Sequence, residues 1–107
     1  MVEKPDSKIN DFIKRINKEF KVELAVLFGS RARGDYLENS DYDVLIVSKD
    51  FENMFFTTRI SELYKFWKYF PIDIEPLCYT PEEFEKMKKR IGIVQQALKE
   101  GIVLYYQ

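Results

Sequence analysis

Apolar residues recur along the start of the chain with the spacing of one helix face. They fall three or four positions apart, which predicts an amphipathic helix, and they are Ile9, Phe12, Ile13, Ile16 and Phe20. Asp6 or Ser7 can cap this helix, because a short side-chain oxygen accepts a hydrogen bond from a first-turn N–H. The following run, Val22 to Phe28, is mostly apolar without clean alternation. It predicts a strand buried on both faces, which Gly29 ends.

Polar residues dominate from Arg31 to Ser40, which predicts a short helix and a loop, and a second strand follows from Tyr42 to Val47. The segment from Thr57 to Phe70 predicts a crossover helix that Pro71 stops. Its apolar stripe consists of Ile60, Leu63, Tyr64, Trp67 and Phe70. Two further aromatic residues, Phe66 and Tyr69, lie off this stripe and are expected at the surface.

The last third of the chain reads as strand, helix, helix and strand. Ile72 to Leu77 predicts a third strand, and Thr80-Pro81-Glu82-Glu83 forms a capping box for a helix through Met87. Gly92 breaks this helix, and a second helical stretch reaches Leu98 and Lys99. Gly101 is a C-cap before a short final strand, Ile102 to Tyr105.

Acidic residues stand at the heads of two predicted strands. Asp41 and Asp43 are two positions apart, so they share one face and can grip one cation together. For Ser30, at the end of the first strand, to meet them, the first two strands must run antiparallel. If Asp73 joins the same cluster, the second and third strands run parallel with the helix as their crossover. We therefore expect an α+β fold with a mixed sheet of about four strands packed with helices.

The composition excludes several classes of partner and metal site. The 107 residues predict a single domain, 1–107, and the net charge of −1 gives no basic excess, so nucleic acid is not the expected partner. With no histidine and one cysteine, a zinc site is excluded and a metal must be oxygen-ligated, as magnesium or manganese is. The apolar runs are too short for a membrane span and the start has no apolar signal core, so we expect no membrane partner and a cytoplasmic protein.

The segment from Gly29 to Val47 reads GSRARGDYLENSDYDVLIV, and its pattern G-S-x10-D-x-D resembles the nucleotidyltransferase superfamily of DNA polymerase beta. The resemblance is closest to the minimal nucleotidyltransferases, and PIDIEPL and EGIVLYY suit it too. A P-loop is excluded because Asp35 stands where that motif needs lysine. Haloacid-dehalogenase phosphatases and many glycosyltransferases place a D-x-D after an apolar strand, whereas here it comes before one. No dinucleotide fingerprint is present.

The resemblance implies two magnesium or manganese ions and ATP as substrate. It implies that Asp41 and Asp43 hold both ions and that Asp73 completes the catalytic one. Glu75 shares a face with Asp73 and competes with it, but Asp73 suits the family's apolar-Asp-apolar segment better.

The same resemblance assigns Gly29 and Ser30 to the triphosphate. For Arg31 and Arg33 two interpretations stay open. Either they contact phosphate, or they form a solvated face and pair with Asp35 or Glu38.

A single small domain leaves little surface to position an acceptor, so a partner protein or a homo-oligomer is expected to complete the site. In the minimal group the usual partner is a helical HEPN protein, and the pair forms a toxin–antitoxin module in which the transferase attaches AMP to its partner. The resemblance thus implies transfer of AMP from ATP to a protein hydroxyl. The alternative is a non-catalytic module that binds metal or nucleotide and neutralises a partner by contact.

Overall fold

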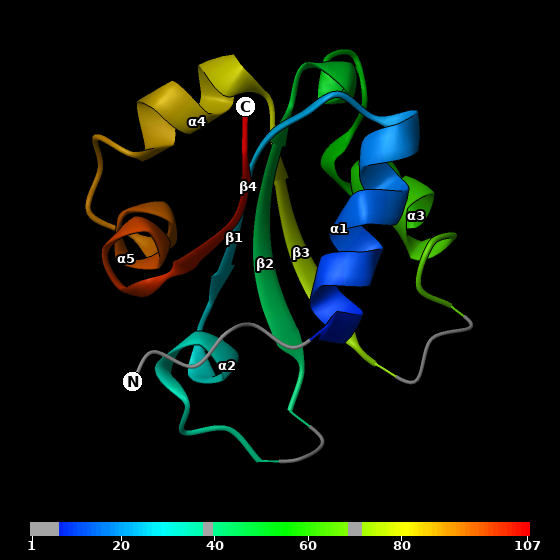
Figure 1. Ribbon diagram of the computed structural model, residues 1–107. Coiled ribbons are helices and arrows are strands. Elements are labelled where there is room, and N and C mark those ends of the chain that lie inside the picture. Colours follow the sequence, from blue (N-terminus) through cyan, green and yellow to red (C-terminus); the bar gives the residue numbers. More distant parts are fainter. Residues whose placement is uncertain (1–6, 38–39, 69–71) are drawn as a thin grey trace.

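The computed structural model describes residues 7–37, 40–68 and 72–107, and it is built on a mixed sheet (Figure 1). The sheet has four strands in the order β3-β2-β1-β4. β1 runs antiparallel to β2 and to β4, whereas β2 and β3 are parallel. The strands are β1 (Val22–Phe28), β2 (Tyr42–Ser48), β3 (Ile74–Tyr79) and β4 (Ile102–Tyr106). The expected α+β fold and both expected strand directions are confirmed.

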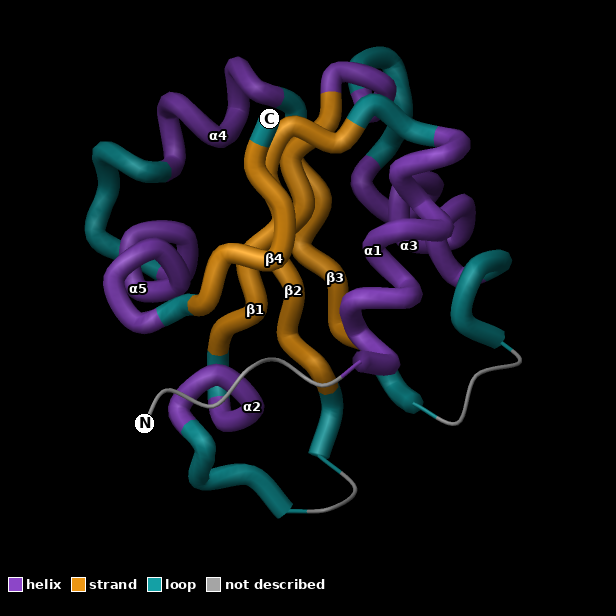
Figure 2. Tube along the Cα trace, viewed as in Figure 1, coloured by secondary structure: helices purple, strands orange, loops and turns teal. Residues whose placement is uncertain are grey.

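Helices cover both faces of this sheet. One face carries α1 (Ser7–Glu19) and α3 (Phe56–Tyr64), and the other carries α4 (Pro81–Met87) and α5 (Ile93–Glu100), as Figure 2 shows. The short helix α2 (Ser30–Arg33) lies at one end of the sheet, and a 3-10 turn, η1 (Lys49–Phe51), follows β2. The sheet therefore separates two cores.

The two cores follow the alternation of side chains along each strand. The core under α1 and α3 includes Leu27, Tyr42, Val44 and Ile46, together with the predicted stripe of α1. The core under α4 and α5 is smaller and consists of Val26, Phe28, Leu45, Tyr79, Val94 and Ala97. Because β1 and β2 contribute to both cores, both strands are buried on both faces, which was predicted for β1.

Helix α1 begins at Ser7 and buries Ile9, Phe12, Ile13 and Ile16. Asp6, the other cap candidate, lies outside the described residues. The capping box at α4 is also confirmed. The Glu83 N–H donates to the Thr80 hydroxyl at 3.1 Å, and the Thr80 N–H donates to the Glu83 carboxylate at 2.8 Å.

The crossover helix is shorter than predicted, and two aromatic placements were wrong. α3 ends at Tyr64, which is 51% exposed, whereas Phe66 packs against the larger core. The Phe66 and Trp67 N–H groups donate to carbonyls three residues back, not four. This tighter winding rotates the following side chains away from α-helical spacing. Tyr69, Phe70 and Pro71 lie outside the described residues.

Strand β3 begins two residues later than predicted, at Ile74, and continues to Tyr79. The later elements agree with expectation, since α5 starts after Gly92 and β4 follows Gly101. Within the described ranges, none of the helices combines the length and the apolar character needed to cross a bilayer.

Candidate functional site

Three strand ends meet at the end of the sheet beside α2. β1 finishes there at Phe28, and β2 and β3 begin there. Asp41 directly precedes β2, and Asp43 is the second residue of that strand. In the register of the sheet, Asp43 stands between Phe28 of β1 and Glu75 of β3. Because directly opposed residues share a face, these carboxylates lie on the side of the sheet that α4 and α5 cover.

The carboxyl group of Glu75 lies within hydrogen-bonding reach of both Asp41 and Asp43. Its pKa is raised, first by the hydrogen bond to Asp41 and then by burial. Burial also raises the pKa of Asp43, with a further contribution from the negative charge of Asp41. The three acids thus hold more negative charge than their surroundings compensate, which favours a shared proton or a cation.

A ready-made metal cage is absent from the part of the chain that the structure describes. Across these residues, no three acidic, histidine or cysteine side chains already have the arrangement of a metal site. The donor set nevertheless fits a hard cation, because Asp41, Asp43 and Glu75 offer only carboxylate oxygens. A cation can compensate the negative charge that these three carboxyl groups bring together.

Asp73, which the sequence favours as the third acid, occupies a different position. It lies one residue before β3 with an exposed side chain, and its backbone carbonyl accepts a hydrogen bond from the Tyr42 N–H at 2.9 Å. The register aligns Glu75, not Asp73, with Asp43. The geometry therefore brings Glu75 to the aspartate pair.

Gly29 forms the turn between β1 and α2 with φ 72° and ψ −157°. A Cβ atom built on it would collide with the carboxylate of Asp43. Only glycine adopts this backbone without strain and leaves room for the acid. The Gly29 carbonyl accepts hydrogen bonds from the N–H groups of Ala32 and Arg33 at 3.1 Å each, and Ser30 is the first residue of α2.

The two arginines of the motif lie apart. Arg33 pairs with Asp35 at 3.2 Å, which is one of the two interpretations left open by the sequence, and with Glu100 at 3.1 Å. Its positive charge lowers the pKa of Asp43, so it acts on the acid cluster. Glu38, the other suggested partner, lies outside the described residues.

Arg31 points elsewhere. Its Nε and Nη2 donate to the Ser40 carbonyl at 3.2 and 3.0 Å, and its guanidinium lies 4.2 and 4.4 Å from the ring centres of Tyr36 and Tyr42. Neither this arrangement nor the Arg33–Glu100 pair was predicted. No local sequence pattern predicts the contact between Arg33 and Glu100, because the two residues lie 67 positions apart.

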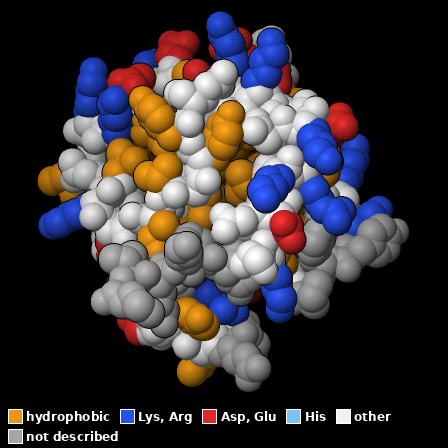
Figure 3. Space-filling view, in the orientation of Figure 1, with side chains coloured by type: hydrophobic (Ala, Val, Ile, Leu, Met, Phe, Trp, Pro, Cys, Tyr) orange, Lys and Arg blue, Asp and Glu red, His pale blue; other side chains and the backbone are white. Residues whose placement is uncertain are grey.

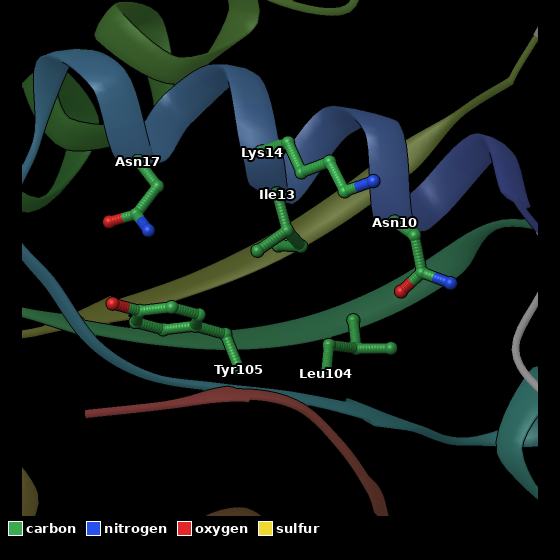
Figure 4. A pocket seen from close by; sticks show the side chains of 6 residues that line it. All are labelled: Asn10, Ile13, Lys14, Asn17, Leu104 and Tyr105. Atoms are coloured by element: carbon green, nitrogen blue, oxygen red, sulfur yellow. The ribbon is translucent and has the colours of Figure 1, made fainter.

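A separate hollow of about 410 Å³ lies between α1 and β4 (Figure 4). It is lined by Asn10, Ile13, Lys14, Asn17, Leu104 and Tyr105. Figure 3 shows apolar side chains gathered near β4 in this view, and Lys and Arg mainly on the side of α1. The hollow opens on the α1 face, whereas the acids lie on the opposite face, so it is not part of the acid cluster.

Comparison with known proteins identifies the family. Residues 7–104 match the family described as "Nucleotidyltransferase domain". The chain belongs to this nucleotidyltransferase family. It is 33% identical over 100 residues to "Putative protein adenylyltransferase MJ0604" of Methanocaldococcus jannaschii, covering 91% of this chain and 94% of the relative. A second protein of that organism, "Putative protein adenylyltransferase MJ0141", is 46% identical over 48 residues, or 39% of this chain and 48% of that protein.

Solved structures support the nucleotidyltransferase fold. A "putative nucleotidyltransferase from Sulfolobus solfataricus" superposes with a TM-score of 0.65 at 23% identity, over 92% of this chain and 78% of that one. A chain from a toxin–antitoxin structure with AMP-PNP superposes with a TM-score of 0.58 at 20% identity, over 92% and 73% of the two chains. At these identities the likeness concerns the fold.

Proposed function

We propose that this nucleotidyltransferase transfers AMP from ATP to a hydroxyl group of a partner protein, in the cytoplasm. The observation that carries the proposal is the meeting of Asp41, Asp43 and Glu75 beside the Gly29 turn, in a chain of this family. The choice of AMP and of a protein acceptor is supported by the name of the relative that covers most of the chain. The toxin–antitoxin neighbour with AMP-PNP agrees with both a nucleotide and a protein partner.

Asp41, Asp43 and Glu75 would hold two magnesium or manganese ions, and we propose Glu75 in place of Asp73 as the third acid. When bound, such ions stabilise charge on the triphosphate and lower the pKa of an acceptor hydroxyl. Gly29 would let the backbone approach the triphosphate, and Ser30 would donate to it from its N–H and hydroxyl. The protein's main contribution is then to position the reacting groups.

Four single variants test this assignment, each measured for Mn²⁺ binding and for ATP binding by calorimetry. Asp41→Asn and Asp43→Asn should abolish metal-dependent ATP binding. Glu75→Gln should weaken Mn²⁺ binding by about tenfold or more, since it removes one charged ligand. Asp73→Asn is the matched control, because this acid lies two residues away and is exposed like Glu75 but is not aligned with Asp43. If Asp73→Asn has the large effect and Glu75→Gln the small one, the assignment of the third acid is wrong.

The acceptor requires a second experiment. We propose a helical HEPN-type protein, encoded by a neighbouring gene, as the partner of a toxin–antitoxin pair in which this chain is the antitoxin. Mixing the two proteins with Mg²⁺ and ATP should give a partner heavier by one AMP or by a short series of them, and Asp43→Asn should prevent this. Stable complex formation with an unmodified partner, while ATP is bound, would instead favour a module that acts by contact alone.

A further inference from the structure

The two arginines of the GSRARG turn point to opposite sides of α2. Residues two apart in an α-helix are separated by about 200° around its axis. Arg33 accordingly reaches Glu100 of α5, on the face where the acids lie, and Arg31 reaches the segment before β2. Two residues that look equivalent in the sequence therefore occupy different environments.

Arg31 makes a contact set typical of a structural clamp. Two of its guanidinium nitrogens donate to the Ser40 carbonyl, and the rings of Tyr36 and Tyr42 lie against it at 4.2 and 4.4 Å. A planar guanidinium suits this combination of a paired hydrogen bond and ring stacking, which an ammonium group cannot reproduce. The Ser40 hydroxyl in turn accepts a hydrogen bond from the Leu37 N–H at 3.0 Å.

The clamped groups flank Asp41 on both sides. The Ser40 carbonyl is the group just before Asp41, and Tyr42 stands between Asp41 and Asp43. Tyr42 is 2% exposed and belongs to the core under α1. Because successive strand residues point to opposite faces, the carboxylates lie on the other side of β2 from this ring. Arg31 thus holds the backbone that carries the acids without facing the space between them.

We propose that Arg31 is a positioning residue that fixes the segment carrying Asp41 and Asp43, and that Arg33 alone of the two arginines serves the triphosphate. The second half rests on the proposed function. Arg33 has a half-exposed side chain held by ion pairs at the surface, which are weak enough to be exchanged for phosphate. Arg31 would have to abandon its stack and both of its Ser40 hydrogen bonds to do the same.

Matched variants separate the two roles by three measurements on the full chain. Arg31→Lys and Arg33→Lys keep the charge, and Tyr36→Leu removes one stacking ring without changing charge. The measurements are hydrogen exchange of the Ser40 to Tyr42 amides without metal, Mn²⁺ affinity without nucleotide, and ATP affinity at saturating Mn²⁺. Circular dichroism and the unfolding midpoint establish that each variant is folded.

For Arg31→Lys we expect faster exchange at Ser40 to Tyr42 and Mn²⁺ affinity lower by about tenfold, as for other residues that orient metal ligands. ATP affinity at saturating Mn²⁺ should stay within about twofold, because no phosphate contact is lost. Tyr36→Leu should shift the same two quantities less. Arg33→Lys should leave exchange and Mn²⁺ affinity unchanged and should weaken ATP binding.

Two results overturn the proposal. Weaker ATP binding in Arg31→Lys, with exchange and Mn²⁺ affinity unchanged, would make Arg31 a phosphate ligand. Unchanged exchange in both Arg31→Lys and Tyr36→Leu would mean that the clamp does not order the segment. If the unmodified chain binds neither Mn²⁺ nor ATP, the proposed function fails, and the exchange measurement still decides whether Arg31 fixes the segment.

Discussion

The two ends of β3 place glutamates in opposite electrostatic settings. Beyond its C-terminal end, Glu83 accepts hydrogen bonds from Arg59 at 2.6 and 3.2 Å and from the Thr80 N–H, and its pKa is lowered, chiefly by Arg59. At the N-terminal end, Glu75 faces Asp41 and Asp43, and its pKa is raised. The carboxylate beyond the C-terminal end is paired with a positive charge, whereas the carboxylate at the N-terminal end faces two further acids.

The paired charges beyond the C-terminal end of β3 stabilise the fold. Arg59 is 4% exposed and also donates to the carbonyls of Met54 and Cys78, so a single side chain joins α3, β3 and α4. Such a fully bonded network rigidifies the structure. The opposite end retains excess negative charge that the fold does not need, and such groups are typical of ligand sites. The comparison therefore separates the residues that stabilise the fold from the residues that we propose bind a ligand.

The largest expected loss of stability is at the C-terminal end of β3, where Arg59 pairs with Glu83. Arg59→Met leaves the Glu83 carboxylate and two carbonyls without their buried donor, so the free energy of unfolding should fall by about 3 kcal/mol. Urea unfolding measures this loss, and Mn²⁺ binding in the folded fraction should not change. Arg90→Met, at an exposed arginine, is the control and should cost less than about 0.5 kcal/mol. A loss of stability no larger than that of the control would contradict the role of Arg59.

The next effect distinguishes two glycines with positive φ, Gly29 at 72° and Gly34 at 88°. Alanine at Gly34, which has left-handed helical backbone, should cost about 1 kcal/mol from strain, and alanine at Gly29 should cost at least as much, because ψ −157° lies in a region almost confined to glycine. Gly29→Ala should cost about 1 kcal/mol more, because its Cβ collides with Asp43, whereas nothing lies near a Cβ at Gly34. Unfolding midpoints and ATP titrations test the pair. Equal effects on ATP binding would show that the approach of Gly29 to Asp43 is irrelevant to the site.

Ser30→Ala removes one proposed donor to the triphosphate and leaves the backbone in place. ATP affinity should fall by about 1.5 kcal/mol, the usual worth of a hydrogen bond to a charged group. Stability should change little, because Ser30 is only half-buried. Calorimetry with ATP and with AMP tests the point, since AMP lacks the terminal phosphates and should bind both forms equally. Unchanged ATP affinity would mean that the turn does not contact phosphate.

The smallest effect is a difference in pH dependence between the two ends. Burial raises the pKa of Asp43, so in the absence of divalent cations the folded chain keeps a proton that the unfolded chain has lost. Stability therefore falls as the pH rises from the ordinary carboxylate pKa through the raised one. The pKa of Glu83 is lowered, so its stabilisation is present above the ordinary pKa and is lost as the pH falls through the lowered one.

Unfolding in EDTA from about pH 3 to about pH 7 should show both effects. Asp43→Asn should reduce the loss of stability that accompanies rising pH. Glu83→Gln should reduce the loss of stability that accompanies falling pH. Added Mg²⁺ should offset the decline in the unmodified chain and have no such effect in Asp43→Asn. Identical pH profiles of stability for the two variants would contradict the proposed electrostatic difference between the two ends of β3.

Local patterns in the sequence predicted most of the framework. The bounds of β1 agree residue for residue with the prediction, α1 buries its predicted stripe, and the capping box forms at Thr80. These features depend on neighbours within a few positions, so a single sequence contains the information. The Gly29 turn and the Asp41–Asp43 pair were found for the same reason, because a turn and the alternation of a strand are local rules.

Tertiary structure decided what depends on distant partners. Asp73 and Glu75 share a strand face, so alternation cannot separate them, and only the pairing of β3 with β2 aligns Glu75 with Asp43. Arg31 and Arg33 look equivalent until Tyr42 and Glu100 are in place. The sequence by itself determined that these residues stand at turns and strand ends, because those are local features, whereas strand pairing brought the ends together. Which of them face one another was decided by strand register and by contacts from remote parts of the chain.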